Sequence, residues 1–143
     1  IMAGAEHAGA TLFYRNVDFN SYGFLNARED FLENDPEVAQ LVVDAYAAAA
    51  QWAADNPQET AEILADTAGI DVPVAEKGIR ERSNLDVDQV PGPAQTAVLE
   101  KIGPMFVELG DVQSQQQVDD ALGSIIDDTF AKQADATRLQ QNA

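Results

Sequence analysis

The chain has 143 residues, of which 25 are acidic and 8 basic, so its formal net charge is −17. A field of that sign repels phosphate backbones and anionic lipids, which argues against nucleic-acid and membrane-surface ligands. Cysteine is absent, which removes disulfides, thiol catalysis and thiolate metal sites, and no apolar run reaches the ~18 residues of a membrane span.

Two strands are expected near the N-terminus. Residues 10–17 (ATLFYRNV) are apolar and aromatic, and residues 21–28 (SYGFLNAR) alternate, with Tyr22, Phe24 and Asn26 on one face. Two strands are too few for an independent sheet. We therefore expect them to belong to a larger sheet, on which the amphipathic helices that follow would pack.

The first long helix is predicted to begin at Pro36, with Asp35 as its N-cap. It should end at Asp55, because Pro57 disfavours helical backbone at Asn56. Apolar residues recur along it at intervals of three and four, which predicts a buried stripe. That stripe comprises Val38, Leu41, Val42, Ala45, Ala49, Trp52 and Ala53.

The remaining helices carry similar start and stop signals. Pro57 and Glu59 open the second helix, and Gly69 is its expected stop. Gly78 weakens the third by about 1 kcal/mol relative to alanine, and the Gly103-Pro104 pair predicts a kink in the fourth. The expected ranges are 57–68, 72–82, 94–109 and 114–133, with a long loop over 83–93.

No motif for catalysis or nucleotide binding is present: neither a phosphate-binding glycine loop nor a nucleophile elbow occurs. His7 has no triad partner nearby, and a flexible N-terminal histidine explains it better than a catalytic base. Calcium loops need more oxygens at fixed spacing than the acidic pairs supply. Solvated faces explain the two helical pairs better, and the third pair lies in the predicted loop. The pairs are Asp86 with Asp88, Asp119 with Asp120, and Asp127 with Asp128.

Aromatic and polar residues mix within residues 13–24 (FYRNVDFNSYGF). Small-molecule clefts are usually apolar with a few placed polar donors, which makes this segment a candidate ligand-binding edge. On composition alone, an aromatic core strand followed by a polar loop explains the segment better.

The order of these features resembles the C-terminal region of solute-binding proteins of ABC importers, in the branch that binds aliphatic sulfonates, taurine and nitrate. The resemblance covers residues 10–132. Its motifs are a strand that ends in a small residue and arginine (26–28), a "DF" turn (30–31), a "PE" helix start (36–37) and a tryptophan near that helix's end (52). They continue with "NPQETAEILADTAG" (56–69), which matches the family pattern "NPxEAAxILAxxxG" except at Thr60. A short helix that reaches arginines (80–82) and a late helix that ends in "LG" and a valine (94–112) follow.

That resemblance implies a type II periplasmic-binding-protein fold, with two α/β lobes around a ligand cleft. This chain would be mostly helical with two short N-terminal strands. Residues 1–19 would hold the end of the second lobe and the crossing strand, and residues 20–132 the C-terminal part of the first lobe, as helical layers on a sheet. Residues 133–143 would be a flexible polar tail. By position, the resemblance implies that Asn20, Ser21 and Tyr22 face the ligand.

The implied function is that of the substrate-binding component of an ABC import system. Such a component captures a small anionic solute, similar to a sulfonate, taurine or nitrate, in the cleft between its lobes and delivers it to a membrane permease. The implied partners are the solute, the permease with its ATPase, and an N-terminal half of the same protein expected upstream of Ile1. Catalysis, a cofactor, a metal and nucleic acid are not expected.

The resemblance also implies export, either to the periplasm or to the cell exterior on a lipid anchor. Because part of the sheet is expected upstream, we expect the isolated chain to be only marginally stable. Two other functions remain open from the residues alone. One is a stand-alone acidic helical module that binds another protein, and the other is an enzyme that uses acidic residues.

Overall fold

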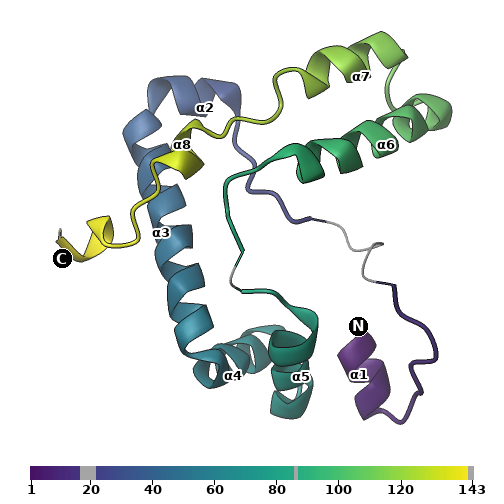
Figure 1. The fold of residues 1–143 in the computed structure, drawn as a ribbon, viewed down its shortest axis with the longest axis vertical. Helices are drawn as coiled ribbons and strands as arrows, with labels where there is room; N and C mark the ends of the chain where they lie inside the picture. The colour runs from purple at the N-terminus through teal and green to yellow at the C-terminus, as the bar shows by residue number, and fades with distance from the viewer. Residues whose placement is uncertain (17–21, 86, 142–143) are drawn as a thin grey trace. The chain divides into compact units, whose positions relative to one another are not determined.

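The computed structural model describes residues 1–16, 22–85 and 87–141, and all the regular structure in these ranges is helical (Figure 1). The predicted α/β class is therefore wrong for the described part of the chain. Residues 10–16 and 22–28, predicted to lie in strands, form no ladder. β propensity reflects packing on neighbouring strands more than an intrinsic backbone preference. With no neighbouring strand within the described residues, the alternating pattern of residues 22–28 stays irregular.

The described helices follow the local start and stop signals closely. Pro57 occupies the first turn of α4, and the residue after that helix, Gly69, adopts left-handed backbone with φ 63°. Gly110, with φ 79°, ends α6 in the same conformation. The bounds are α1 Met2–His7, α2 Glu29–Asn34, α3 Pro36–Asp55, α4 Pro57–Ala68, α5 Val72–Arg82, α6 Pro93–Leu109, α7 Gln115–Leu122, α8 Thr129–Lys132 and the 3-10 helix η2 Arg138–Gln141.

Two helical predictions need correction. The helix expected over 114–133 is two helices, α7 and α8, because the intervening Gly-Ser-Ile-Ile-Asp-Asp sequence combines glycine, β-branched and capping residues that disfavour a helix interior. The N-terminal residues, for which no element was predicted, form α1.

The chain divides into two compact units. Unit 1 consists of the described residues of Ile1–Asn20, Asp44–Val87 and Asp135–Ala143, and unit 2 of those of Ser21–Val43 and Asp88–Ala134.

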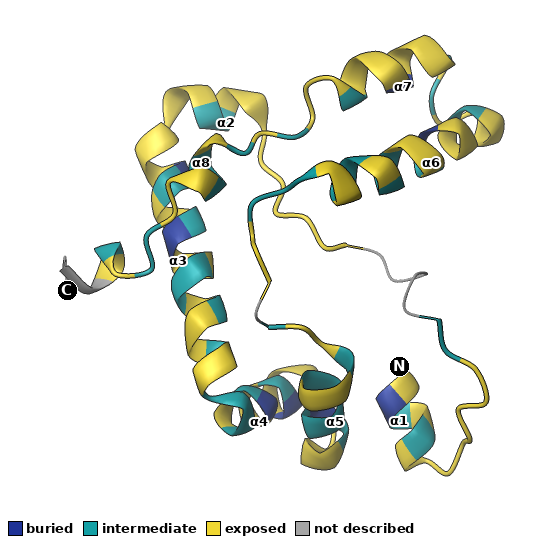
Figure 2. Ribbon diagram, viewed as in Figure 1, coloured by how far each residue is buried: buried dark blue, intermediate teal, exposed yellow. Residues whose placement is uncertain are grey.

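Unit 1 has a small core in which α4 packs on α5. Ala61, Ala65 and Ala75 are buried there, with Leu64 and Ile79 packed against them. Small residues at the contact allow two helices to approach closely but bury little apolar surface. Figure 2 shows accordingly that exposed and half-buried positions outnumber buried ones on these helices.

In unit 2 the contact between α6 and α7 depends on Gly103. A Cβ atom at this position would overlap the Cγ1 atom of Val118 and would lie 3.6 Å from its Cβ atom. Both residues are buried. Glycine at position 103 therefore allows α7 to lie directly against α6, a role that the predicted kink did not include.

The apolar stripe of α3 is exposed, contrary to the prediction that it is buried. Val38, Leu41, Val42 and Trp52 are between 40% and 48% exposed. The buried positions of α3 are Ala39 and Asp44, which fall between the stripe residues in sequence. The periodicity correctly identified an apolar face, but the described residues supply no apolar layer to cover it.

Candidate functional site

The sequence predicted a ligand-facing edge at Asn20, Ser21 and Tyr22. Asn20 and Ser21 lie outside the described residues. Tyr22 lies in an irregular segment of unit 2, and its side chain is 45% exposed. The ligand-facing role of these three residues therefore stays a prediction.

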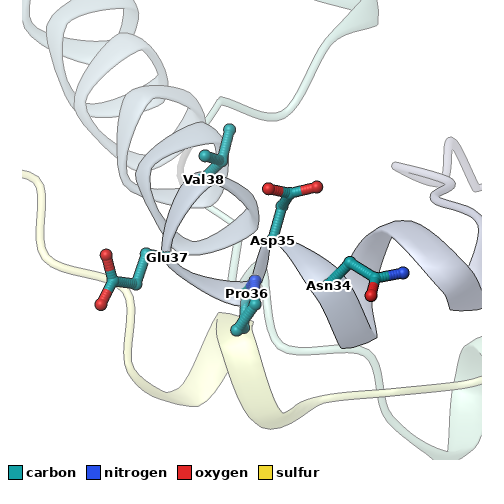
Figure 3. Close-up of a pocket in the computed structure, with 5 residues that line it drawn as sticks. All are labelled: Asn34, Asp35, Pro36, Glu37 and Val38. Carbon is teal, nitrogen blue, oxygen red and sulfur yellow. The ribbon is translucent and has the colours of Figure 1, made fainter.

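A hollow of about 300 Å³ lies in unit 2 where α2 meets α3 (Figure 3). A helix N-terminus attracts anions through its unpaired backbone N–H groups. At the N-terminus of α3, the carboxylates of Asp35 and Glu37 point to opposite sides of the first turn. Their negative charges oppose the binding of an anion there. The hollow is thus a poor anion site. Its lining residues are Asn34, Asp35, Pro36, Glu37 and Val38.

The densest positive charge of the chain is on α5 in unit 1. Lys77, Arg80 and Arg82 are three of the eight basic residues and lie within six positions. Glu6 of α1 binds two of them: its Oε1 accepts from Lys77 Nζ at 3.2 Å and its Oε2 from Arg82 Nη2 at 2.7 Å. Arg80 instead donates to Gln58 Oε1 at 3.1 Å. We call Glu6, Lys77 and Arg82 the α5 ion cluster.

The α5 ion cluster is partly shielded from water, since the side chains of Glu6 and Arg82 are 19% and 17% exposed. The hydrogen bond from Lys77, with that from Arg82 and the charges of both, lowers the pKa of Glu6 against the opposing effect of desolvation. One donor remains unused: Arg82 Nε is buried and has no acceptor. Glu81 lies at the edge of the cluster, 3.9 Å from Lys77 Nζ.

A second charged contact in unit 1 involves Asp44, which is 0% exposed. Its Oδ1 accepts from the backbone N–H of Asp135 at 2.9 Å, and its Oδ2 accepts from Arg138 Nη1. A buried carboxylate needs such partners. Asp44 therefore holds residues 135–138 against α3, which is a structural role rather than a chemical one.

The other acidic and histidine candidates have structural partners. His7 Nε2 lies 3.5 Å from Asp71. Asp119 and Asp120 each accept from a glutamine amide one turn earlier, at 2.8 Å. In the next acidic pair, Asp127 accepts from the backbone N–H of Thr129 and Asp128 forms an ion pair with Lys132. In the loop pair, Asp88 accepts from the backbone N–H of Val90, and Asp86 lies outside the described residues.

The sequence analysis missed both charged contacts for a common reason. Glu6 is separated from Lys77 by 71 positions, and Asp44 from Arg138 by 94. A weak local signal was present for each. Asp44 is the only charged residue between Glu37 and Asp55 in an alanine-rich helix, and α5 concentrates basic residues in an acidic chain.

No family model matches the chain, and no curated protein or solved structure matches it either. Within the described ranges, no helix is long and apolar enough to cross a membrane. The same ranges hold no group of three or more histidine, aspartate or glutamate side chains that could bind a metal ion.

Proposed function

We propose that this chain forms part of the substrate-binding component of an ABC import system, which captures a small anionic solute of the sulfonate, taurine or nitrate type and delivers it to a membrane permease. The supporting observation is the agreement between the motif order and the helix boundaries. The "PE" pair at 36–37 begins α3, the "NP" pair at 56–57 separates α3 from α4, Gly69 ends α4, and α5 ends in arginine. Because proline and glycine mark helix ends in any chain, the support lies in the order and spacing of these motifs together.

The chemistry of such capture is compatible with a strongly acidic chain. A net charge of −17 disfavours nonspecific anion binding. A bound anion then needs local donors, such as backbone N–H groups, amides and hydroxyls, in a site that excludes water. Among the residues implied by the resemblance, Asn20 offers an amide and Ser21 and Tyr22 offer hydroxyls.

The test is ligand-dependent thermal stability of the natural protein that carries this sequence. Taurine, methanesulfonate and nitrate form the panel, and uncharged dimethyl sulfone is the matched control. A ligand present at 100 times its Kd stabilises the folded state by about 2.7 kcal/mol. We expect one panel member to raise Tm and dimethyl sulfone to leave it unchanged. The absence of any shift across the panel contradicts the proposal.

A second candidate function is supported by the exposed stripe on α3. A stand-alone acidic helical module would use exposed apolar side chains such as Val38 and Leu41 to bind another protein. The two functions predict different results for Leu41→Asp. The interaction module loses a protein partner in a pull-down and shows no ligand-dependent shift. The solute-binding component retains its ligand-dependent shift provided that it remains folded.

A further inference from the structure

We infer that Lys77 and Arg82 form a binding site for a tetrahedral oxyanion that presents three oxygens, such as a sulfonate, sulfate or phosphate group, and that Glu6 occupies this site as a tethered internal ligand. The inference goes beyond the proposed function. Neither Lys77 nor Arg82 was among the residues expected to face the transported solute.

The unused donor of Arg82 carries the argument. An arginine side chain presents Nε and Nη2 as a fork that matches two oxygens of one anion. Arg28 of this chain uses the whole fork, since its Nε and Nη2 donate to the two carboxylate oxygens of Asp30 at 2.9 Å and 2.8 Å. Arg82 uses only half of it: Nη2 binds Glu6, whereas Nε is buried without an acceptor.

In this structure Glu6 satisfies two of the three donors. One of its oxygens binds Lys77 and the other binds Arg82 Nη2. A sulfonate, sulfate or phosphate group has a third oxygen, which can accept from Arg82 Nε while the other two replace the oxygens of Glu6. A three-oxygen anion can therefore give each of the three donors an oxygen of its own, whereas the carboxylate of Glu6 has only two oxygens to share among them.

The internal ligand is held weakly enough to be displaced. α1 has six residues, no side-chain N-cap hydrogen bond and one buried residue, Ala3. Helices of this length do not persist without tertiary contacts. Displacement of Glu6 by an oxyanion should therefore release α1 from α5, whereas the α4–α5 contact through Ala61, Ala65 and Ala75 remains.

Charge places a limit on the site. The chain is strongly acidic, and Glu81 lies 3.9 Å from Lys77 Nζ, so long-range electrostatics oppose anion binding. Binding must then depend on the direct hydrogen bonds to Lys77 and Arg82. Removal of the competing carboxylate of Glu6 should consequently have a large effect.

The test is an anion titration of the full chain, in which the NMR chemical shifts of the α5 amides report binding. Chloride holds the ionic strength constant. Inorganic sulfate, inorganic phosphate and methanesulfonate are compared with acetate, which has only two oxygens. In Glu6→Gln, which preserves side-chain size, sulfate affinity should rise about tenfold or more, because two charge-assisted hydrogen bonds no longer compete. Acetate should bind more weakly than methanesulfonate.

Arg82→Lys in the Glu6→Gln background keeps the charge but removes the fork, and should lower sulfate affinity about tenfold. Arg80→Gln is the matched control, since it changes one charge on the same helix outside the cluster, and it should alter affinity no more than about twofold. A preference for methanesulfonate identifies an organic sulfonate as the ligand type, and a preference for sulfate or phosphate identifies the free ion. Equal effects of Arg82→Lys and Arg80→Gln overturn the inference.

Hydrogen exchange of the unsubstituted chain tests the displacement without any variant. Saturating sulfate should speed exchange of the α1 amides, and chloride at equal ionic strength should not. Shifts in α5 with unchanged α1 protection contradict displacement of Glu6. The proposed function is separable from this outcome, because solute-dependent stabilisation that survives Arg82→Lys leaves it standing even if the oxyanion site fails.

Discussion

Replacing Gly103 with alanine should destabilise the contact between α6 and α7. The added Cβ would lie closer than 3.0 Å to Val118 Cγ1 and 3.6 Å from Val118 Cβ, whereas carbon atoms in contact are about 3.5 to 4.0 Å apart. Overpacking of this kind costs about 1–3 kcal/mol. The higher helix propensity of alanine offsets up to about 1 kcal/mol. Because the overlap involves a buried side chain, we expect a net loss near 2 kcal/mol.

The assay is urea denaturation followed by far-UV circular dichroism. Gly78→Ala is the matched control, because Gly78 also lies within a helix but a Cβ there meets nothing within 4 Å. This control should stabilise the chain by about 0.5–1 kcal/mol. Val118→Ala, which by itself costs about 1.6 kcal/mol for two buried methyl groups, should remove most of the penalty of Gly103→Ala in a double-mutant cycle. Stabilisation by Gly103→Ala, or a penalty unchanged by Val118→Ala, would refute the α6–α7 contact.

Three further predictions concern unit 1. Asp44→Asn should lower the free energy of unfolding, measured in urea, by about 1–2 kcal/mol, because it removes the charge of a buried carboxylate whose partner Arg138 is partly exposed. The same change should speed hydrogen exchange over residues 135–138, and unchanged exchange would contradict the contact. Ala75→Leu should cost about 1–3 kcal/mol by overfilling the α4–α5 core, and a neutral result in the same assay would show that this core is loose. The third concerns pH. Because the pKa of Glu6 is lowered, its contribution to α1 docking should be complete above the ordinary value of 4.5 and lost as pH falls through the folded-state value; Glu6→Gln should abolish that dependence of α1 exchange.

The helix boundaries could be predicted because they depend on local chemistry. Proline at a first turn and glycine after a last turn act through the backbone of a few neighbouring residues. The predicted boundaries of α3 and α4 are therefore confirmed: α3 ends at Asp55, α4 begins at Pro57, and Gly69 follows its last turn. The break between α7 and α8 was also encoded locally, but the apolar spacing of Ile125 and Ile126 obscured it.

The strands and the buried stripe of α3 were predicted from patterns that need a partner. Alternation at Tyr22 and Phe24 indicates a strand only where another strand pairs with it. Likewise, the spacing of Val38, Leu41 and Trp52 identifies an apolar face but not the surface that covers it. Both patterns lie in this chain without such a partner among its described residues.

The candidate site was hardest to predict from sequence. The sequence shows that Lys77 and Arg82 lie five positions apart in one predicted helix. The carboxylate that binds both belongs to Glu6, in a helix that local signals did not indicate. Long-range ion pairs of this kind depend on how elements dock. Periodicity and capping chemistry do not report that docking.

Calorimetric titration of the natural protein that carries this sequence with taurine, methanesulfonate and nitrate is the most direct measurement of the proposed function. Capture of a small anionic solute predicts saturable binding of at least one of these anions that survives Arg82→Lys, and no binding of dimethyl sulfone. Uniform absence of binding across the three anions, in protein that unfolds cooperatively, would contradict it.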